Sequence, residues 1–215
     1  MVSSVKIKIC GLTNLDDAQV AVDLGADMLG FIFYPKSPRF IELDKAREII
    51  DKIPTFVDIV GLFVNPDFET LRLAHNEGCF NWFQLHGDET PEFCRSIHWM
   101  NCRLMKAIRV RGKEDIEQAS AFPADCLLLD TYNKDKYGGT GEQFDWSWLK
   151  PMNTPVMLSG GINPDNVIAA IDTGVNGIDI CSGVESKPGK KDHNKMQQLF
   201  DNIRLATGRK GKNET

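Results

Sequence analysis

The sequence predicts a single α/β domain, a (β/α)8 TIM barrel with eight parallel strands. The chain has 215 residues, which suits one domain with a large core. Short apolar or β-branched runs alternate with stretches of helical spacing at intervals of roughly 25 residues. This alternation implies parallel strands joined by right-handed crossovers, and eight such units close a barrel.

The apolar runs give the strands in order along the chain. They are Val5–Cys10, Met28–Tyr34, Asp58–Val64, Trp82–His86, Arg103–Val110, Cys126–Asp130, Pro155–Ser159 and Gly177–Cys181. A capping side chain followed by proline predicts three of the helix starts between them. These pairs are Asn65-Pro66, Thr90-Pro91 and Asn163-Pro164.

An open doubly wound sheet is the alternative fold. It would normally show GxGxxG after its first strand and have fewer strand–helix units, and neither feature is present. We expect the barrel to occupy residues 1–205. Residues 206–215, rich in Gly, Lys and Arg, are expected to form a polar, disordered tail.

Composition excludes several classes of function. The formal net charge of −5 provides no basic stripe for nucleic acid, and no apolar run approaches the roughly 20 residues of a membrane helix. Six cysteines without a CxxC motif indicate reduced thiols and a cytoplasmic protein. Cys94, His98 and Cys102 share one spacing, but known zinc sites rarely have it, so no metal is expected.

Catalytic groups of such barrels lie at the C-terminal ends of the strands and in the loops that follow. Two-residue alternation places Cys10 on the same face as Lys8, toward the barrel axis at the upper rim. Asp130 ends the otherwise apolar run Leu127–Leu129 at the same rim. The alternatives are a buried, inert thiol for Cys10 and a loop-capping carboxylate for Asp130.

Two glycine-containing loops follow the seventh and eighth strands, at Gly160-Gly161 and Ser182-Gly183. Loops at these positions often bind phosphate through backbone N–H groups, although ordinary turns also use glycine. The longer segment Tyr132–Phe144, which contains Gly139, is either a lid over the barrel mouth or a surface excursion.

The loop after the second strand ends in Arg39, stiffened by Pro35 and Pro38. A rigidly held guanidinium can bind both oxygens of a substrate carboxylate, and the alternative is a surface arginine. Gln84 and His86 end the fourth strand with the same facing, where a histidine is more often a hydrogen-bonded wall residue than a catalyst.

Taken together, these motifs resemble the phosphoribosylanthranilate isomerase family. The resemblance runs in register from Lys8 to about Gly189 and rests on an ordered set of motifs rather than on any single one. The motifs are Lys8-Ile9-Cys10-Gly11, Ser37-Pro38-Arg39, Gln84-Leu85-His86-Gly87, Asp130 with Gly139-Thr140-Gly141 and Phe144-Asp145-Trp146, Ser159-Gly160-Gly161, and Asp179 with Ser182-Gly183-Val184-Glu185. One departure is Cys181, where the family more often has serine or asparagine.

The resemblance implies a role for each matching position. Cys10 would be the general base and Asp130 the general acid of an Amadori rearrangement in tryptophan biosynthesis. Arg39 would hold the anthranilate carboxylate, the seventh and eighth loops with Gly139 would hold and cover the phosphate, and Asp179 would lie near the site. The implied partner is a phosphorylated aminosugar.

The chemistry agrees with this set. Opening the ribose ring needs a proton on its ring oxygen, and forming the enamine needs loss of the C2′ proton, so one acid and one base suffice without a cofactor. Other sugar-phosphate barrels, such as a metal-dependent epimerase or indole-glycerol-phosphate synthase, and a non-catalytic barrel are the alternatives. The sequence leaves the oligomeric state open.

Overall fold

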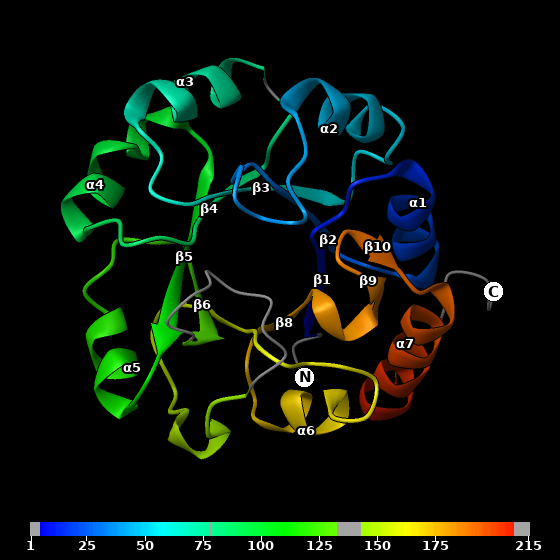
Figure 1. The fold of residues 1–215 in the computed structure, drawn as a ribbon. Helices are drawn as coiled ribbons and strands as arrows, with labels where there is room; N and C mark the ends of the chain where they lie inside the picture. Colours follow the sequence, from blue (N-terminus) through cyan, green and yellow to red (C-terminus); the bar gives the residue numbers. More distant parts are fainter. Residues whose placement is uncertain (1–4, 78, 133–142, 209–215) are drawn as a thin grey trace.

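A computed structural model of the chain, described for residues 5–77, 79–132 and 143–208, confirms the predicted closed barrel (Figure 1). Eight strands pair in parallel in sequence order, and β1 pairs with β8 to close the ring. Their bounds are β1 Lys6–Cys10, β2 Met28–Ile32, β3 Asp58–Phe63, β4 Trp82–Leu85, β5 Arg103–Val110, β6 Cys126–Thr131, β7 Val156–Leu158 and β8 Gly177–Ile180.

Helices surround the strands, as Figure 1 shows. They are α1 Leu15–Leu24, α2 Leu43–Ile50, α3 Phe68–Asn76, α4 Pro91–Ser96, α5 Lys113–Ala119, α6 Val167–Asp172 and α7 His193–Thr207, with the short 3-10 helices η1 His98–Met100, η2 Trp146–Trp148 and η3 Ser182–Val184. A small hairpin of β9 Glu185–Lys187 and β10 Lys190–Lys191 precedes α7. Between β6 and β7 the described residues form η2, and residues 133–142 of this connection are not among the described residues.

One of the three predicted helix starts is confirmed and two are wrong. Thr90 caps α4 with Pro91 in its first turn. Asn65 instead lies at a positive φ of 48°, and α3 begins two residues later than predicted, where Asp67 accepts a hydrogen bond from the Thr70 amide. Likewise Asn163 and Pro164 lie in a turn, and α6 begins only at Val167. Asparagine before proline stabilises turns as readily as helix starts, so the pair alone does not locate the helix.

The interior of the barrel changes character along its axis. Its lower half is apolar, filled by the cluster Met28, Val60, Met105, Ala107, Cys126, Leu128 and Met157. Above it, near the C-terminal ends of the strands, the buried inward groups include Lys8, Gln84, Asp130 and Asp179. A packed apolar lower half closes the barrel, so polar chemistry is confined to the upper mouth.

A buried carboxylate connects the first helix to the last. Asp17 on α1 accepts hydrogen bonds from the Lys191 amide at 2.8 Å and from His193 Nε2 at 2.8 Å. The side-chain amide of Asn14, the N-cap residue of α1, also donates to Asp17. Burial opposes its charge, but these donors outweigh burial and lower the pKa of Asp17. The segment before α7 is thereby held against α1, next to the β1–β8 closure.

Among the residues that the structure describes, no helix is both long and apolar enough to cross a membrane.

We predict that Asp17→Ala lowers the free energy of unfolding by about 1 to 3 kcal/mol, because it leaves the buried Lys191 amide without its acceptor. Since the folded-state pKa is depressed, this contribution is present at neutral pH and is lost as the pH falls through that pKa. Urea unfolding at pH 7 and at about pH 3, below the ordinary aspartate pKa, measures both effects. Asp16→Ala, at the exposed neighbouring position, is the control and should change stability far less; equal losses for the two variants would contradict the assigned role.

Candidate active site

Cys10 lies at the upper rim of the barrel, at the end of β1, with its thiol next to a buried ion pair. Lys8, two residues earlier, has no exposed surface, and its Nζ lies 2.8 Å from Asp179 Oδ1 on β8. The other oxygen of Asp179 accepts a hydrogen bond from Ser159 at the end of β7. Gly30 on β2 makes room for the thiol, because a Cβ there would come within 2.8 Å of Cys10 Sγ.

The surroundings of Cys10 favour the protonated form of both Lys8 and the thiol, so the ammonium is charged and the thiol is neutral. Burial disfavours the Lys8 ammonium, but attraction to Asp179 and a hydrogen bond to Cys10 outweigh it and raise the pKa of Lys8. A hydrogen bond to Cys181 and burial raise the pKa of the Cys10 thiol, while the charge of Lys8 opposes them. Cys10 is therefore held as a thiol that ionises only with the help of its neighbours.

Asp130 is the second-last residue of β6 and lies beside a histidine. Its Oδ2 lies 3.1 Å from His86 Nε2, and its Oδ1 accepts from the Thr131 amide. His86 Nδ1 in turn lies 2.9 Å from Gln84 Nε2. With the Gln84 amide donating to Nδ1, the imidazole carries its proton on Nε2 and directs it at Asp130. Asp130 thus has a proton-carrying partner inside the barrel.

Arg39 lies buried over the rim, bound along one edge by Glu185. Its Nε and Nη2 donate to Glu185 Oε1 and Oε2 at 2.8 and 2.7 Å, and Lys191 Nζ lies 3.2 Å from the same carboxylate. Gly11, at φ +73°, lets Arg39 pass closely, because a Cβ there would lie 2.7 Å from Arg39 Cδ. Within the residues that the structure describes, no acceptor pairs with Nη1 or with the second Nη2 hydrogen, so this edge can bind an anion while Glu185 orients Arg39.

The glycine loops after β7 and β8 pack directly against each other. A Cβ on Gly183 would lie 1.9 Å from the Ile162 carbonyl oxygen, so only glycine permits this contact. Gly160 and Gly161 both have positive φ, 89° and 67°. The Gly161 carbonyl accepts from the side chains of Asn163 and Asn166, which fixes the turn. Within the described residues no acceptor pairs with the N–H groups of Gly160 or Gly161.

These loops also border the predicted acid. A Cβ on Gly160 would lie 2.4 Å from Thr131 Oγ1 and 2.9 Å from Asp130 Oδ1. The mouth therefore brings together Cys10, Asp130, Arg39 and the two glycine loops, with Asp179 one layer below. Gly139, and with it most of the predicted lid, lies outside the described residues.

Sequence reasoning missed several members of this cluster. The sequence analysis assigns no role in the site to Lys8, Glu185 or Lys191. It describes His86 as a hydrogen-bonded wall residue, and His86 does bind Gln84 and Asp130, but the pattern does not indicate that its partner is the predicted acid. The two-residue alternation of the strand could have indicated that Lys8 belongs to the site, because Lys8 lies on the same inward face as Cys10. No local pattern indicates that Glu185, 146 residues further along the chain, binds Arg39.

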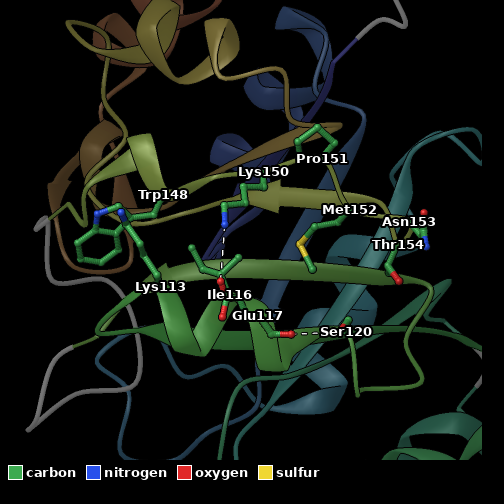
Figure 2. Close-up of a pocket in the computed structure, with 10 residues that line it drawn as sticks. All are labelled: Lys113, Ile116, Glu117, Ser120, Trp148, Lys150, Pro151, Met152, Asn153 and Thr154. Atoms are coloured by element: carbon green, nitrogen blue, oxygen red, sulfur yellow. Dashed lines mark hydrogen bonds and ion pairs between the residues drawn. The ribbon is translucent and has the colours of Figure 1, made fainter.

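A cavity on another part of the surface lies away from the residues at the barrel mouth. Figure 2 shows this cavity of about 380 Å³ on the flank of the barrel, between α5 and the segment that precedes β7. Trp148 and two lysines line it, and Lys150 forms an ion pair with Glu117. It contains no predicted site residue. Residues 5–77, 79–132 and 143–208 contain no group of three or more His, Cys, Asp or Glu side chains arranged to hold a metal ion.

Comparison with known proteins assigns the fold to a family. The model of the family described as N-(5′-phosphoribosyl)anthranilate (PRA) isomerase matches residues 7–202. The chain belongs to the phosphoribosylanthranilate isomerase family. A relative of that name from Magnetococcus marinus is 44% identical over 206 residues, covering 94% of this chain and 97% of the relative.

Solved structures of the phosphoribosylanthranilate isomerase family have the same fold. The enzyme from Thermotoga maritima is 42% identical, with a TM-score of 0.84 over 95% of this chain and all of that one. Another, solved in complex with reduced 1-(o-carboxyphenylamino)-1-deoxyribulose 5-phosphate, is 39% identical with a TM-score of 0.79, again over 95% and 100% of the two chains.

The close packing of Gly160 against Thr131 and Asp130 can be tested by substitution. Gly160→Ala places a side chain at positive φ and against Thr131 and Asp130, whereas Gly174→Ala has a similar φ of 79° and nothing within 4 Å. We predict that Gly174→Ala lowers stability by about 1 to 2 kcal/mol through backbone strain alone. Gly160→Ala should lose about 1 to 3 kcal/mol more, from overpacking. Equal stability of the two variants in denaturant unfolding would contradict the tight contact.

Proposed function

We propose that this chain converts N-(5′-phosphoribosyl)anthranilate to 1-(2-carboxyphenylamino)-1-deoxyribulose 5-phosphate, a step of tryptophan biosynthesis, with Cys10 as base and Asp130 as acid. Family membership supports the reaction. The observation that carries the proposal is the placement of one thiol and one carboxyl at the ends of β1 and β6, at the single polar end of the barrel.

The acid step begins at the sugar ring. The protonated Asp130 carboxyl gives its proton to the ring oxygen of the ribose as the bond from C1′ to that oxygen breaks, and the resulting carboxylate keeps the hydrogen bond from His86 Nε2. The nitrogen lone pair of the substrate then forms the iminium bond to C1′. His86, held by Gln84, orients Asp130 and stabilises its charge after the proton has left.

The base step follows at C2′. The Cys10 thiolate takes the C2′ proton, and the electrons of the broken C–H bond form the double bond of the enamine while the iminium is neutralised. Lys8 stabilises the thiolate beforehand because its ammonium lies next to Cys10. Proton transfer by residues of the chain balances both steps, so the reaction draws on no cofactor.

The two anionic ends of the substrate have separate binding groups in this proposal. The N–H groups of Gly160, Gly161 and Gly183, with Ser182 from the start of η3, suit the phosphate. The remaining edge of Arg39 suits the anthranilate carboxylate. Gly139 would cover the phosphate from the lid.

A cytoplasmic location is part of the same proposal. All six cysteines are unpaired, as expected in a reducing compartment.

We predict that Cys10→Ala and Asp130→Asn each lower kcat by about 10²-fold or more, the usual contribution of positioned proton transfer. KM should change little, because phosphate and carboxylate bind other groups. Loss of substrate fluorescence measures turnover, and a cooperative thermal transition verifies folding. Cys102→Ala, a thiol on the outer side of the barrel wall, serves as the control and should keep parental kcat. Rates for Cys10→Ala within tenfold of the parent would mean that another residue is the base.

A further inference from the structure

A buried ion pair lies beside the loop that carries His86, on the outer side of the barrel wall. Lys106 on β5 is 2% exposed, and its Nζ lies 2.8 Å from Glu89 Oε2. Met105 and Ala107, on either side of Lys106, line the apolar interior, so the lysine side chain leaves the strand on its outer face. The pair therefore lies outside the ring of strands and takes no direct part in the two proton transfers.

Glu89 and Lys106 bind the peptide groups on both sides of Gly87, the residue that follows His86. Both carboxylate oxygens of Glu89 accept from the Gly87 amide at 3.0 Å. Lys106 Nζ donates to the Gly87 carbonyl at 2.9 Å. The Gly87 amide belongs to the peptide group that joins it to His86, and the amide of His86 itself donates to the Phe63 carbonyl at 2.8 Å. The backbone of His86 is therefore fixed on both sides.

The Glu89 carboxylate also joins this loop to the loop after β3. Its Oε1 accepts from the Asn65 amide at 2.8 Å, and Asn65 Oδ1 accepts from the Asp88 amide at 2.7 Å. A Cβ on Gly87 would lie 2.3 Å from Asn65 Oδ1, so the two loops are in direct contact. Glu89 directly precedes Thr90, whose side chain caps α4. The carboxylate is thus anchored at a helix start and binds two loops at once.

We propose that Glu89 and Lys106 are positioning residues for the acid: they hold the loop at Gly87 so that His86 directs its Nε2 proton at Asp130. This rests on the proposed function of Asp130. His86 Nε2 lies 3.1 Å from Asp130 Oδ2. That distance is at the long end of the usual range of about 2.7 to 3.2 Å, so a small movement of the loop breaks the bond. A misplacement of about 1 Å near the reacting groups can cost about 10²-fold in rate.

The charges of the pair give the loop a single arrangement. The ammonium of Lys106 can only donate and the carboxylate of Glu89 can only accept, so each bond forms in one direction. Hydrogen bonds to charged groups are also roughly twice as strong as those between neutral groups. Glu89→Gln replaces one carboxylate oxygen by an amide that cannot accept, and leaves the Lys106 ammonium buried without its counter-charge. The Gly87 amide and the ammonium then compete for one oxygen, and the loop shifts.

The NMR signal of the His86 ring proton tests the proposal without using activity. In the parent this proton lies in a buried hydrogen bond, so it should exchange slowly with water. His86→Asn identifies its signal among those of the four histidines. Glu89→Gln should lose the slowly exchanging signal. Glu92→Gln, which changes an exposed carboxylate in the first turn of α4, is the matched control and should keep it. A signal that persists unchanged in Glu89→Gln would overturn the proposal.

The kinetic constants separate positioning of the acid from a general distortion of the mouth. In Glu89→Gln kcat should fall about 10- to 100-fold, because the acid is misplaced. KM should stay within about twofold, since the groups that bind phosphate and carboxylate lie on other loops. Glu92→Gln should keep both constants. An unchanged kcat in Glu89→Gln, or a KM that rises as much as kcat falls, would contradict the proposal.

A double variant keeps the test valid if Glu89→Gln folds poorly. Adding Lys106→Met removes the uncompensated ammonium, so the thermal stability lost in Glu89→Gln should be recovered. The low kcat should remain, because the Gly87 carbonyl still lacks its donor. Parental kcat in the double variant would overturn the proposal. Parental kcat in Asp130→Asn would instead contradict the proposed function, whatever the His86 signal shows.

Discussion

The ion pair between Lys8 and Asp179 is the interaction on which the upper half of the barrel depends. It joins the first strand of the barrel, β1, to the last, β8, inside the ring, where both side chains are buried. Removing one partner of such a pair typically costs about 3 to 5 kcal/mol, because an uncompensated charge remains buried. Ser159 adds a hydrogen bond from β7, so three strand ends meet at one carboxylate. Cys10 is therefore positioned by the closure of the barrel itself.

The same closure concentrates positive charge in an acidic protein. The chain has a net charge of −5, yet Lys8, Arg39 and Lys191 lie together at the β1–β8 side of the mouth. Glu185 binds both Arg39 and Lys191, and these cations lower the pKa of Glu185 although burial opposes ionisation. The excess positive charge can favour both a thiolate and a doubly anionic substrate. Local arrangement, rather than net charge, sets the chemistry of the site.

The fold could be predicted from the sequence because strand and helix periods differ and repeat eight times. Alternation alone placed Cys10 on the inner face with Lys8, and the apolar run before Asp130 placed that carboxyl at the rim. Helix starts were harder: Asn65-Pro66 and Asn163-Pro164 form turns, since an asparagine cap and an asparagine turn use the same side-chain hydrogen bonds.

Contacts between distant parts of the chain could not be predicted at all. Three contacts join segments that follow different strands. Glu185 forms hydrogen bonds with Arg39, Gly183 packs against Ile162, and His86 lies within hydrogen-bond distance of Asp130. Each depends on the three-dimensional closure of the ring and leaves no local pattern. The glycines in the loops after β7 and β8 indicated where those loops turn, but not which residues the loops pack against.

A structure of this protein with bound reduced 1-(o-carboxyphenylamino)-1-deoxyribulose 5-phosphate, the ligand of a solved relative, tests the central claim most directly. The account predicts the phosphate over Gly160, Gly161 and Gly183, the carboxylate on the remaining edge of Arg39, and Cys10 and Asp130 on opposite sides of the sugar chain. A phosphate bound elsewhere, or both groups on the same side of the sugar, would contradict it.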